Sequence, residues 1–534
     1  MCNHHKHIKI QEDAHSQEHK KWNRRSFLQA LGLVGGGTML LSGSNITASN
    51  PSPLAQAISN SDSENILVLI RLKGGNDGLN TIVPIFDYDN YANLRPTLRF
   101  EESDLIQLNP DIGIPNFMSD LESMWGEGAM KVVHGVGYNN ASLSHFEGSD
   151  IWANTDEAND EQTGWLGRYF EEVYPDYLSN PPEIPAAIQI GSIGNLIFDG
   201  ADNNYAFSVA NPDQLESIAE NGTLYNMSNL PLCTYGDQLR FLRGTTNTTF
   251  NYSGIIHEAY ANSSNEVDYG NGQLGNQLAI VARMIKGNLG TKVYMVTLGG
   301  FDTHANQADK HQQLLTDLSE SVKLFFDDIA STGHADKVLG MTFSEFGRRP
   351  DENGSAGTDH GAGAPLLLFG EGLNGNGFIG DHPSLTNLDT NGNLEFSTDF
   401  RQVYASIMEN WLCIDNLLIS EALLGTSYDS LDLGLICTST LSNNTASLDD
   451  FNHFVYHDRD QTILKINNKY TQHTVIKLYN ILGVEVATLK NEMLLTGTHL
   501  INIKSNAKRH LNTGQYIYRI SSGGKHYSKS ILIL

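Results

Sequence analysis

Apolar runs of strand length alternate along most of this chain with stretches in which apolar residues recur at helical spacing. The strand-like runs are rich in β-branched and aromatic residues, which favour buried strands. They lie at residues 66–72, 130–134, 293–298, 338–343 and 365–369. Apolar positions three and four apart predict helices at 116–126, 273–286, 311–330 and, last in this series, 400–412. Repeated β-loop-α units of this kind predict an α/β fold with a mostly parallel central sheet between helices.

The chain changes its pattern near residue 458. Short segments there alternate apolar and polar residues and are separated by glycines. Strands are expected at 474–480, 484–489, 499–504, 516–521 and 525–534. The pattern predicts a small C-terminal β-sandwich at 458–534, joined by a Ser-, Asn- and Asp-rich linker at 441–457 to the α/β domain at 64–440. Within that domain, residues 151–270 predict a few helices and long loops.

The first 57 residues predict a targeting segment. The hexapeptide at 23–28, with Arg24 and Arg25 at its centre, resembles the twin-arginine export motif, and small residues near Ala57 fit a cleavage site. The apolar stretch at 31–41 is too short and too rich in glycine for a membrane span. The alternative is an arginine pair that occurs by chance before an ordinary secretory segment. Both readings predict export through the periplasm to the cell surface or the medium.

Charge and cysteine content narrow the class of protein. Among 534 residues, 61 acidic and 34 basic side chains give a formal net charge of −27, which argues against a nucleic-acid binder. Only four cysteines occur, one of them in the leader, so a disulfide framework is not expected. A bridge between Cys413 and Cys437 is possible. No CxxC pair indicates a thiolate zinc site. The GGNDG stretch at 74–78 is not a GxGxxG motif, so it does not indicate a dinucleotide, and no GxSxG motif is present.

Polar residues with ligand or catalytic chemistry follow or precede the predicted strands. They are Asp77, Ser144, His145, Asp302, His304, Glu345, Arg348, Asp359 and His360. Ligands bind outside the carboxyl ends of strands in open α/β sheets, so we expect these side chains to meet at one edge. Carboxylates and imidazoles together suit one divalent cation or a pair of them. A serine beside such a cation can act as nucleophile, and an arginine can hold an anion.

Each of these residues also has a structural interpretation. Asp77 suits a turn, because Asn and Asp favour turns. Ser144 suits a helix N-cap. Glu345 and Arg348 could form a salt bridge with one another. His134 and His382 also lie in this part of the chain, and we take them as structural.

Five motifs carry a resemblance to a known family. They are LKGGNDGLNTIVP at 72–84, SHFEGSDIW at 144–152, GGFDTHANQ at 299–307, FSEFGRR at 343–349 and GTDHGAG at 357–363. With them, residues 64–440 resemble the domain of unknown function 1501 family, whose members commonly carry twin-arginine leaders. That family is similar to the alkaline phosphatase and sulfatase superfamily, which implies a central sheet between helices with metal-binding loops at one edge.

The resemblance implies a role for each candidate residue. The metal ligands would be Asp77, Asp302, His304, Glu345, Asp359 and His360. Ser144 would be the nucleophile, His145 an acid or base, and Arg348 an anion clamp. Phe346 stands where the superfamily often has a further ligand histidine, which is a departure from the two-metal pattern. The metal would be zinc, calcium, magnesium or manganese.

The last segment, 458–534, resembles the C-terminal sorting domain of type IX secretion. Its motifs are LYNILGVEV at 478–486 and LNTGQYIY at 511–518. This resemblance implies that the type IX secretion machinery is a partner and that the protein reaches the cell surface or is released.

Together these observations predict an exported, metal-dependent hydrolase of phosphate or sulfate esters. The alternative is a non-catalytic surface binding protein that keeps the alkaline-phosphatase-like fold and takes a small anionic or glycan ligand. A purely structural surface protein is a further alternative, and it predicts that the candidate loops do not converge. No nucleic acid and no transmembrane span in the mature chain are expected.

Overall fold

The computed structural model describes residues 63–177, 180–191, 194–201, 203–222, 224–226, 234–437, 451–458, 461–468, 470–480, 485–507, 511, 514–522 and 525–533. These residues fall into two compact units, one up to residue 437 and one from residue 451. We describe each unit by itself. The targeting segment predicted at 1–57 lies outside the described residues.

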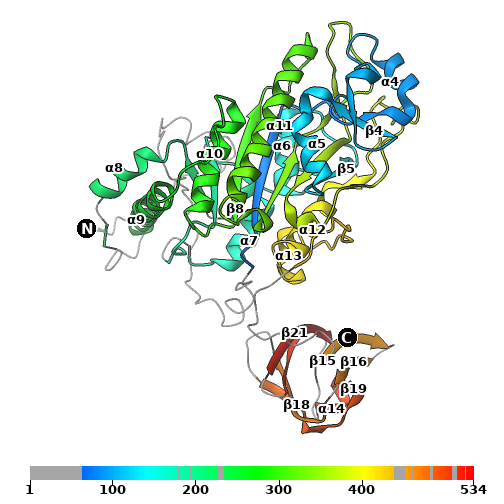
Figure 1. Cartoon of the computed structure of the whole chain (residues 1–534). Coiled ribbons are helices and arrows are strands. Elements are labelled where there is room, and N and C mark those ends of the chain that lie inside the picture. The colour runs from blue at the N-terminus through cyan, green and yellow to red at the C-terminus, as the bar shows by residue number, and fades with distance from the viewer. Residues whose placement is uncertain are drawn as a thin grey trace, which may run out of the picture. The chain divides into compact units, whose positions relative to one another are not determined.

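A nine-stranded sheet forms the centre of the first unit (Figure 1). Its order is β13-β5-β12-β9-β1-β8-β6-β7, and β14 also pairs with β5. All pairings except those of β12 are parallel, which confirms the predicted mostly parallel α/β fold. The strands are β1 (Ile66–Lys73), β5 (Met130–Gly137), β6 (Ala187–Ile190), β7 (Ala206–Val209), β8 (Val293–Gly299), β9 (Val338–Phe343), β12 (Ala364–Phe369), β13 (Gly377–Ile379) and β14 (Thr398–Asp399).

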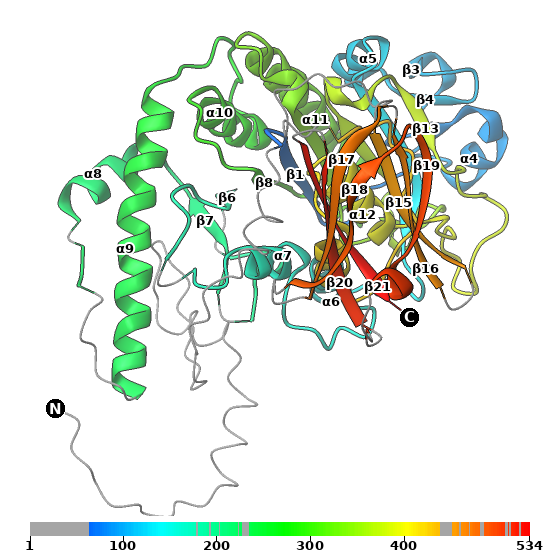
Figure 2. The ribbon, with the colours of Figure 1, turned by 90° about the horizontal axis from the view of Figure 1, so that it is seen from below.

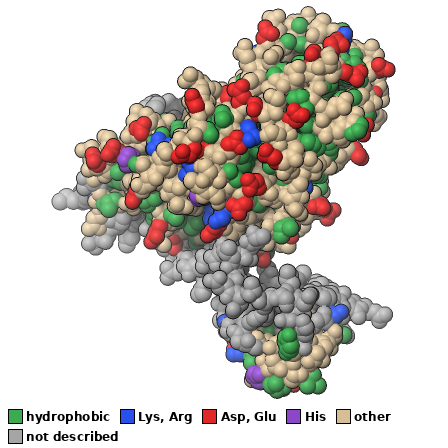
Figure 3. Space-filling view, in the orientation of Figure 1, with side chains coloured by type: hydrophobic (Ala, Val, Ile, Leu, Met, Phe, Trp, Pro, Cys, Tyr) green, Lys and Arg blue, Asp and Glu red, His purple; other side chains and the backbone are tan. Residues whose placement is uncertain are grey.

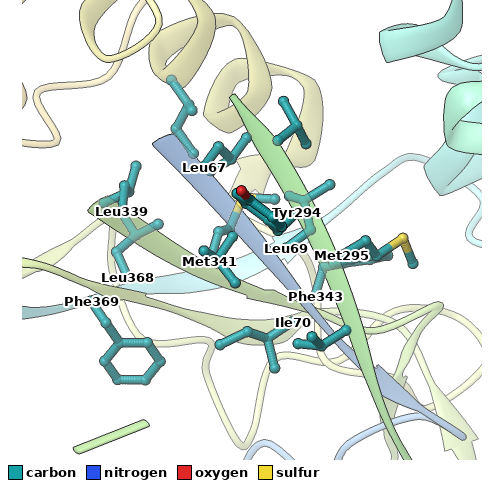
Figure 4. Packing of buried hydrophobic residues seen from close by; sticks show 14 of the residues in the cluster. Leu67, Leu69, Ile70, Tyr294, Met295, Leu339, Met341, Phe343, Leu368 and Phe369 are labelled. Carbon is teal, nitrogen blue, oxygen red and sulfur yellow. The ribbon is translucent and has the colours of Figure 1, made fainter. Parts of the chain in front are cut away.

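Strand β1 lies in the middle of the sheet and is apolar on both faces. Leu67 and Leu69 are fully buried, and Figure 4 shows them packed among residues of β8 and β9 such as Tyr294 and Met341. A near-continuous apolar run is what a parallel strand covered on both sides requires. The run 66–72 therefore specifies the strand on which the rest of the sheet is assembled.

Strand β12 is the exception in the sheet, because it runs antiparallel to both of its neighbours, β5 and β9. Its first residue, Ala364, therefore lies at the edge where the parallel strands end. The segment just before β12 contains Asp359 and His360. Reversal of this one strand brings that segment to the same edge as the loops that follow β1, β8 and β9.

Helices cover both faces of the sheet. Figure 2 shows α5 (Ser119–Gly126), α10 (Gln273–Lys286) and α11 (Gln307–Ala330) on one side of β1 and β8. On the other side lie α6 (His145–Asn154), α7 (Trp165–Val173) and α12 (Phe400–Asn410). In α11 the residues at helical spacing, such as Leu315, Leu318 and Val322, are fully buried.

The helix predictions are confirmed with small shifts. Helix α10 has the predicted bounds, and α11 begins at Gln307 rather than near His311. The prediction that 400–412 is the last helix is wrong, because α13 (Asn416–Ala422) follows it. Two of its seven residues are buried, so its apolar pattern is too short to stand out in the sequence.

Residues 151–270 add strands β6 and β7 to the sheet and form a helical subdomain beside them. Its helices are α8 (Asp213–Asn221) and α9 (Thr234–Ala261), in addition to α7. This agrees with the expectation of a few helices and long loops.

Shorter elements complete the first unit. They are β2 (Val83–Pro84), α4 (Tyr88–Leu94), β3 (Leu105–Gln107), β4 (Ile112–Pro115), β10 (Gly347–Arg348) and β11 (His360–Gly361), and the 3-10 turns 85–87, 102–104, 116–118, 196–198, 335–337 and 371–373. Strands β2, β4 and β3 form one small sheet and the hairpin β10-β11 another.

A disulfide joins Cys413 to Cys437, the bridge that the sequence indicated as possible.

The second unit consists of two antiparallel sheets around a shared core. One has the order β15-β16-β19 and the other β18-β17-β20-β21. Ile466 of the first sheet and Leu478 of the second are fully buried in the same cluster, so the unit is the predicted β-sandwich. Its elements are β15 (Phe451–Asp458), β16 (Gln461–Asn468), β17 (Gln472–Asn480), β18 (Glu485–Leu494), β19 (Gly497–Asn502), α14 (Ile503–Asn506), β20 (Gly514–Ser522) and β21 (Lys525–Ile533).

The start of this unit differs from the prediction. Strand β15 occupies residues 451–458, so the last part of the segment assigned as linker at 441–457 is strand, and β16 was not predicted. Polar residues interrupt the alternation in both strands, which hides the period of two.

Among the described residues, none of the helices combines the length and the apolar composition that crossing a membrane requires.

Candidate metal centre

The loops that follow β1, β8 and β9 are packed tightly against one another. Gly74 has a φ of +127°, and a Cβ added there would lie 2.3 Å from the backbone nitrogen of Asp302. The Gly74 N–H donates to the Glu345 Oε1 at 3.0 Å. No side chain fits at this position, so the two glycines after β1 let the loops converge.

Asp302 lies at the centre of the convergence. Its Oδ1 is 3.0 Å from the His304 Nε2 and 3.2 Å from the His360 Nε2. Its Oδ2 is 3.3 Å from the His145 Nε2. The three imidazoles come from the loop after β8, the segment before β12 and the start of α6.

A hydrogen-bond acceptor lies on the far side of each ring from Asp302. The Nδ1 of His360 lies 2.7 Å from the Leu143 carbonyl oxygen, which can only accept, so Nδ1 is the donor. The Nδ1 of His145 faces the Glu345 carboxylate at 2.9 Å, and that of His304 faces the Asp359 carboxylate at 3.2 Å. Each ring therefore has an acceptor at its Nδ1 and presents its Nε2 to Asp302.

This donor set fits a divalent cation. One atom each from His145, Asp302 and His360 lie within 4.8 Å of one another. The His304 Nε2 is 2.9 Å from the His360 Nε2, so the two ring nitrogens are close enough to share a proton or a cation. Protein ligands to metals commonly have this arrangement, in which imidazole Nδ1–H groups are held by carboxylates or carbonyls. The side chain of Asp302 is 46% exposed, so the centre is open to solvent.

The electrostatics of the centre keep its carboxylate ionised. Burial raises the pKa of Asp302, but the hydrogen bonds from Arg348 and His360 and the charges of Arg348 and His145 outweigh it and lower this pKa well below its usual range. Burial lowers the pKa of His360, more than its hydrogen bonds to Leu143 and Asp302 raise it. The two directions favour an anionic Asp302 beside a neutral His360.

Two predicted ligands, Glu345 and Asp359, lie behind the histidines instead. Glu345 is 2% exposed and its Oε1 contacts His145. Its Oε2 is buried without a hydrogen-bond partner among the described residues. Asp359 contacts the far side of His304 and is held by Asn353 at 3.0 Å. These carboxylates orient histidines rather than face the centre.

The prediction that Arg348 clamps a substrate anion is not supported by its position. Its side chain is fully buried and donates to the carbonyl oxygens of Gly75, Thr358, Gly74 and Phe301. It also donates to the Asp302 Oδ1 at 2.8 Å. Arg348 holds three loops together and orients Asp302, and it does not pair with Glu345.

Asp77, the first predicted ligand, also lies away from the centre. Its carboxylate is fully buried in a bidentate ion pair with Arg95, at 2.6 and 3.0 Å, and also accepts a hydrogen bond from Gln307. Burial alone would raise the pKa of Asp77, but the charge and hydrogen bonds of Arg95 lower it overall. Neither the metal interpretation nor the simple turn interpretation anticipated this ion pair.

Ser144 occupies the N-cap position of α6 without a side-chain cap hydrogen bond. The residue is exposed, and its hydroxyl makes no hydrogen bond within the described chain. It directly follows Leu143, whose carbonyl holds His360. Its role as nucleophile stays a prediction.

Phe346 and His145 have roles that the sequence did not indicate. The Phe346 ring lies 4.9 Å from the ring of His145 and 4.2 Å from that of His360, so it packs against two of the imidazoles. His145, expected as an acid or base, directs its Nε2 toward the Asp302 Oδ2 at 3.3 Å. His134 is buried and stacks on Phe378, and the ring of the half-buried His382 lies 5.2 Å from that of His134. Burial lowers the pKa of both histidines, that of His134 to about 3.

Comparisons with known proteins agree with the expected family. A family model described as "Protein of unknown function (DUF1501)" matches residues 131–395. A search of curated proteins found no match.

The solved structures that match this chain include a sulfatase, a protein in the alkaline phosphatase superfamily and an alkaline phosphatase. The PsFucS1 sulfatase from Pseudoalteromonas sp. has 9% sequence identity and a TM-score of 0.31, and the match covers 90% of this chain and 94% of that one. The protein in the alkaline phosphatase superfamily from Vibrio parahaemolyticus has 9% identity and a TM-score of 0.30, with 79% of this chain and 78% of that one covered. Alkaline phosphatase from the Antarctic bacterium TAB5 has 10% identity and a TM-score of 0.25, with 59% of this chain and 94% of that one covered.

Proposed function

We propose that this protein is a metal-dependent hydrolase whose cation is held by His145, Asp302, His304 and His360. The observation that carries the proposal is the convergence of three imidazole Nε2 atoms on one carboxylate that is held ionised. The Nε2 atoms of His304 and His360 lie 2.9 Å apart, a separation that one shared cation or one shared proton accounts for.

Zinc is the metal that this donor set fits best among zinc, calcium, magnesium and manganese. Imidazole nitrogen suits zinc, whereas calcium and magnesium take mostly oxygen ligands. When bound, the cation would polarise a substrate oxygen and lower the pKa of a water molecule. Glu345, Asp359 and the Leu143 carbonyl would keep the imidazoles in the required tautomer, and Arg348 would keep Asp302 in place.

The proposed substrates are phosphate or sulfate esters, as the family resemblance implies. Ser144 supports this choice, because it is exposed and directly follows Leu143, whose carbonyl oxygen contacts His360, so its hydroxyl is proposed as the nucleophile. The position of His145 supports its role as a ligand rather than as an acid or base.

Export is part of the proposal. The Cys413–Cys437 disulfide supports it, because disulfides persist mainly in oxidising compartments. The leader would direct the chain to the twin-arginine route, and residues 458–534 would then engage the type IX secretion machinery.

The experiment that tests the proposal is elemental analysis of protein purified from its native export route. Wild type is compared with Asp302→Ala/His304→Ala and with Asp309→Ala, which removes an exposed carboxylate on α11. We expect about one equivalent of zinc in wild type and in Asp309→Ala and much less in the double variant. Hydrolysis of aryl phosphate and aryl sulfate esters by the same samples should follow the metal.

Two outcomes would replace the proposal. Metal-free wild type with an intact fold would favour the non-catalytic binding protein. Metal that is retained in the double variant would show that the cation lies elsewhere in the chain.

A further inference from the structure

Arg349, the residue after Arg348, lies near enough to Asp359 and Asp389 for its charge to lower the pKa of both carboxyl groups. It forms no ion pair or side-chain hydrogen bond among the described residues, and its Nε is buried without an acceptor. A buried donor without an acceptor is rare. The adjacent Arg348, in contrast, is surrounded by carbonyl oxygens and Asp302.

The hairpin β10-β11 places Arg349 opposite Asp359, the residue before His360. Arg348 faces His360 in the ladder, and the next pair follows from the Arg349 N–H, which donates to the Asp359 carbonyl oxygen at 3.0 Å. Residues that face each other in an antiparallel pair project to the same side, with Cβ atoms about 4.5–5.5 Å apart. Arg349 therefore stands next to Asp359, whose carboxylate contacts His304.

A second hairpin, residues 388–394, lies on the other side of Arg349. A Cβ added to Gly392 would be 3.8 Å from the Arg349 Nη1. The next residue, Asn393, is 4% exposed, and its Oδ1 is also buried without a partner. Two unsatisfied groups thus belong to two neighbouring segments, a donor on Arg349 and an acceptor on Asn393.

The positive charge of Arg349 acts on the carboxyl group of Asp359, although the two side chains form no described ion pair. The pKa of Asp359 is lowered first by the hydrogen bond from Asn353, then by His304, and to a smaller extent by the charge of Arg349. Yet the Arg349 guanidinium makes no described ion pair with Asp359. The face of the molecule in Figure 3 carries many acidic side chains and few basic ones, in keeping with the formal net charge of −27.

We infer that Arg349 binds the anionic group of the ligand, a tetrahedral oxyanion of the phosphate or sulfate class, on the His304 side of the centre. A guanidinium presents paired N–H donors that match two oxygens of such a group. The inference rests on the proposed function for the cation beside it. The inference assigns anion binding to the half-buried Arg349 and not to Arg348, which is buried.

The test measures binding of inorganic phosphate and, separately, inorganic sulfate to the full-length protein by isothermal titration calorimetry. Wild type is compared with Arg349→Met, Arg349→Lys and Arg99→Met, with and without added zinc. Arg99 is a partly exposed arginine that pairs with Glu101, so its variant controls for loss of one positive charge. Zinc content and melting temperature are recorded for every sample.

We expect Arg349→Met to weaken oxyanion binding by at least about 10-fold, and Arg349→Lys to weaken it less, because a lysine keeps the charge but lacks the planar fork. Arg99→Met should bind like wild type, and all variants should keep their zinc. The anion that wild type binds more tightly, phosphate or sulfate, indicates the class of ester.

The outcomes separate this inference from the proposed function. If zinc binds but the Arg349 variants hold both anions as wild type does, the inference is overturned and the hydrolase proposal stands. If no sample binds zinc and Arg349-dependent anion binding persists, the hydrolase proposal fails and the anion site stands. If neither zinc nor either anion binds to wild type, both are wrong, and Arg349 is hydrated by ordinary water.

Discussion

Asp77 and Asp302 start from nearly the same local sequence and end in opposite environments. Each follows two glycines and one further residue after a strand, as Gly-Gly-Asn-Asp and Gly-Gly-Phe-Asp. The strands, β1 and β8, are parallel neighbours, with Lys73 opposite Gly299. Asp77 is fully buried and paired with Arg95, whereas Asp302 is about half exposed and faces three imidazoles.

The difference shows that the sequence Gly-Gly-x-Asp determines that a carboxylate lies at the edge of the sheet, but not what that carboxylate contacts. What the carboxylate does depends on which residues arrive from elsewhere. Arg95 comes from the end of α4 and closes around Asp77, and it also donates to the carbonyl oxygens of Pro350 and Arg349. Asp302 meets groups from α6 and from the segment before β12, and these leave one side open.

Breaking the buried pair should have the largest effect on stability. Asp77→Asn leaves the Arg95 guanidinium buried without its counter-charge, and removal of one partner of such a pair costs about 3–5 kcal/mol. Asp302→Asn removes a carboxylate that is 46% exposed, and carbonyl oxygens still accept hydrogen bonds from the buried Arg348 guanidinium, so we expect a smaller loss of about 1 kcal/mol. Urea denaturation of both variants measures the contrast. Equal losses would mean that the two aspartates have the same structural role.

Breaking the open centre should have the largest effect on metal binding. Asp302→Ala is expected to lower zinc affinity by more than the roughly 10- to 100-fold typical of losing an outer hydrogen-bonding partner. Competition with a fluorescent chelator measures the affinity. The control is Asp309→Ala on α11, which should bind zinc as wild type does, and retention of wild-type affinity by Asp302→Ala would exclude this residue as a ligand.

Glu345 offers a finer test of how the imidazoles are oriented. Glu345→Gln keeps the shape but can present an amide N–H to the His145 Nδ1, which removes the reason for its proton to be there. We expect zinc affinity to fall by about 10- to 100-fold with little loss of stability. Nuclear magnetic resonance of imidazole nitrogens reports the tautomer directly. An unchanged tautomer together with unchanged affinity would remove Glu345 from the metal centre.

The smallest expected effect is a pH dependence of the Asp77 contribution. The folded-state pKa of Asp77 is below its unfolded value near 3.8, so its ionised form adds stability that is present above about pH 4 and is lost as the pH falls through the folded pKa. The stability difference between wild type and Asp77→Asn should therefore shrink by about 1 kcal/mol between pH 7 and pH 3. Unfolding curves at both pH values measure it, and a difference that grows on acidification would contradict the lowered pKa.

The fold was largely predictable because its central elements have strong local patterns. The apolar run of β9 and the helical spacing of α10 gave the observed bounds. The position of β12 was not predictable, since the run 365–369 reads the same in either direction. Only its pairing with β5 and β9 reveals that it is antiparallel.

The candidate site was predictable as a set of loops but not as a set of roles. The residue types at the strand ends indicated metal chemistry, and Asp302, His304 and His360 do meet. Asp77 and Arg348 were misplaced because their partners, Arg95 and a group of backbone carbonyls, carry no sequence signal. Glu345 and Asp359 contact the far sides of His145 and His304 and not Asp302 itself. This distinction depends on the direction of the side chains and not on residue type.

The Cys413–Cys437 disulfide has a mechanical consequence for the end of the first unit. Cys413 follows α12, and the bridge joins it to a residue 24 positions later, which encloses α13 in a covalent loop. Tension applied to the chain beyond Cys437 therefore passes through sulfur to Cys413 and bypasses α13. A tether attached downstream would pull on the helix that packs against the sheet and would not peel away the short helix in the loop.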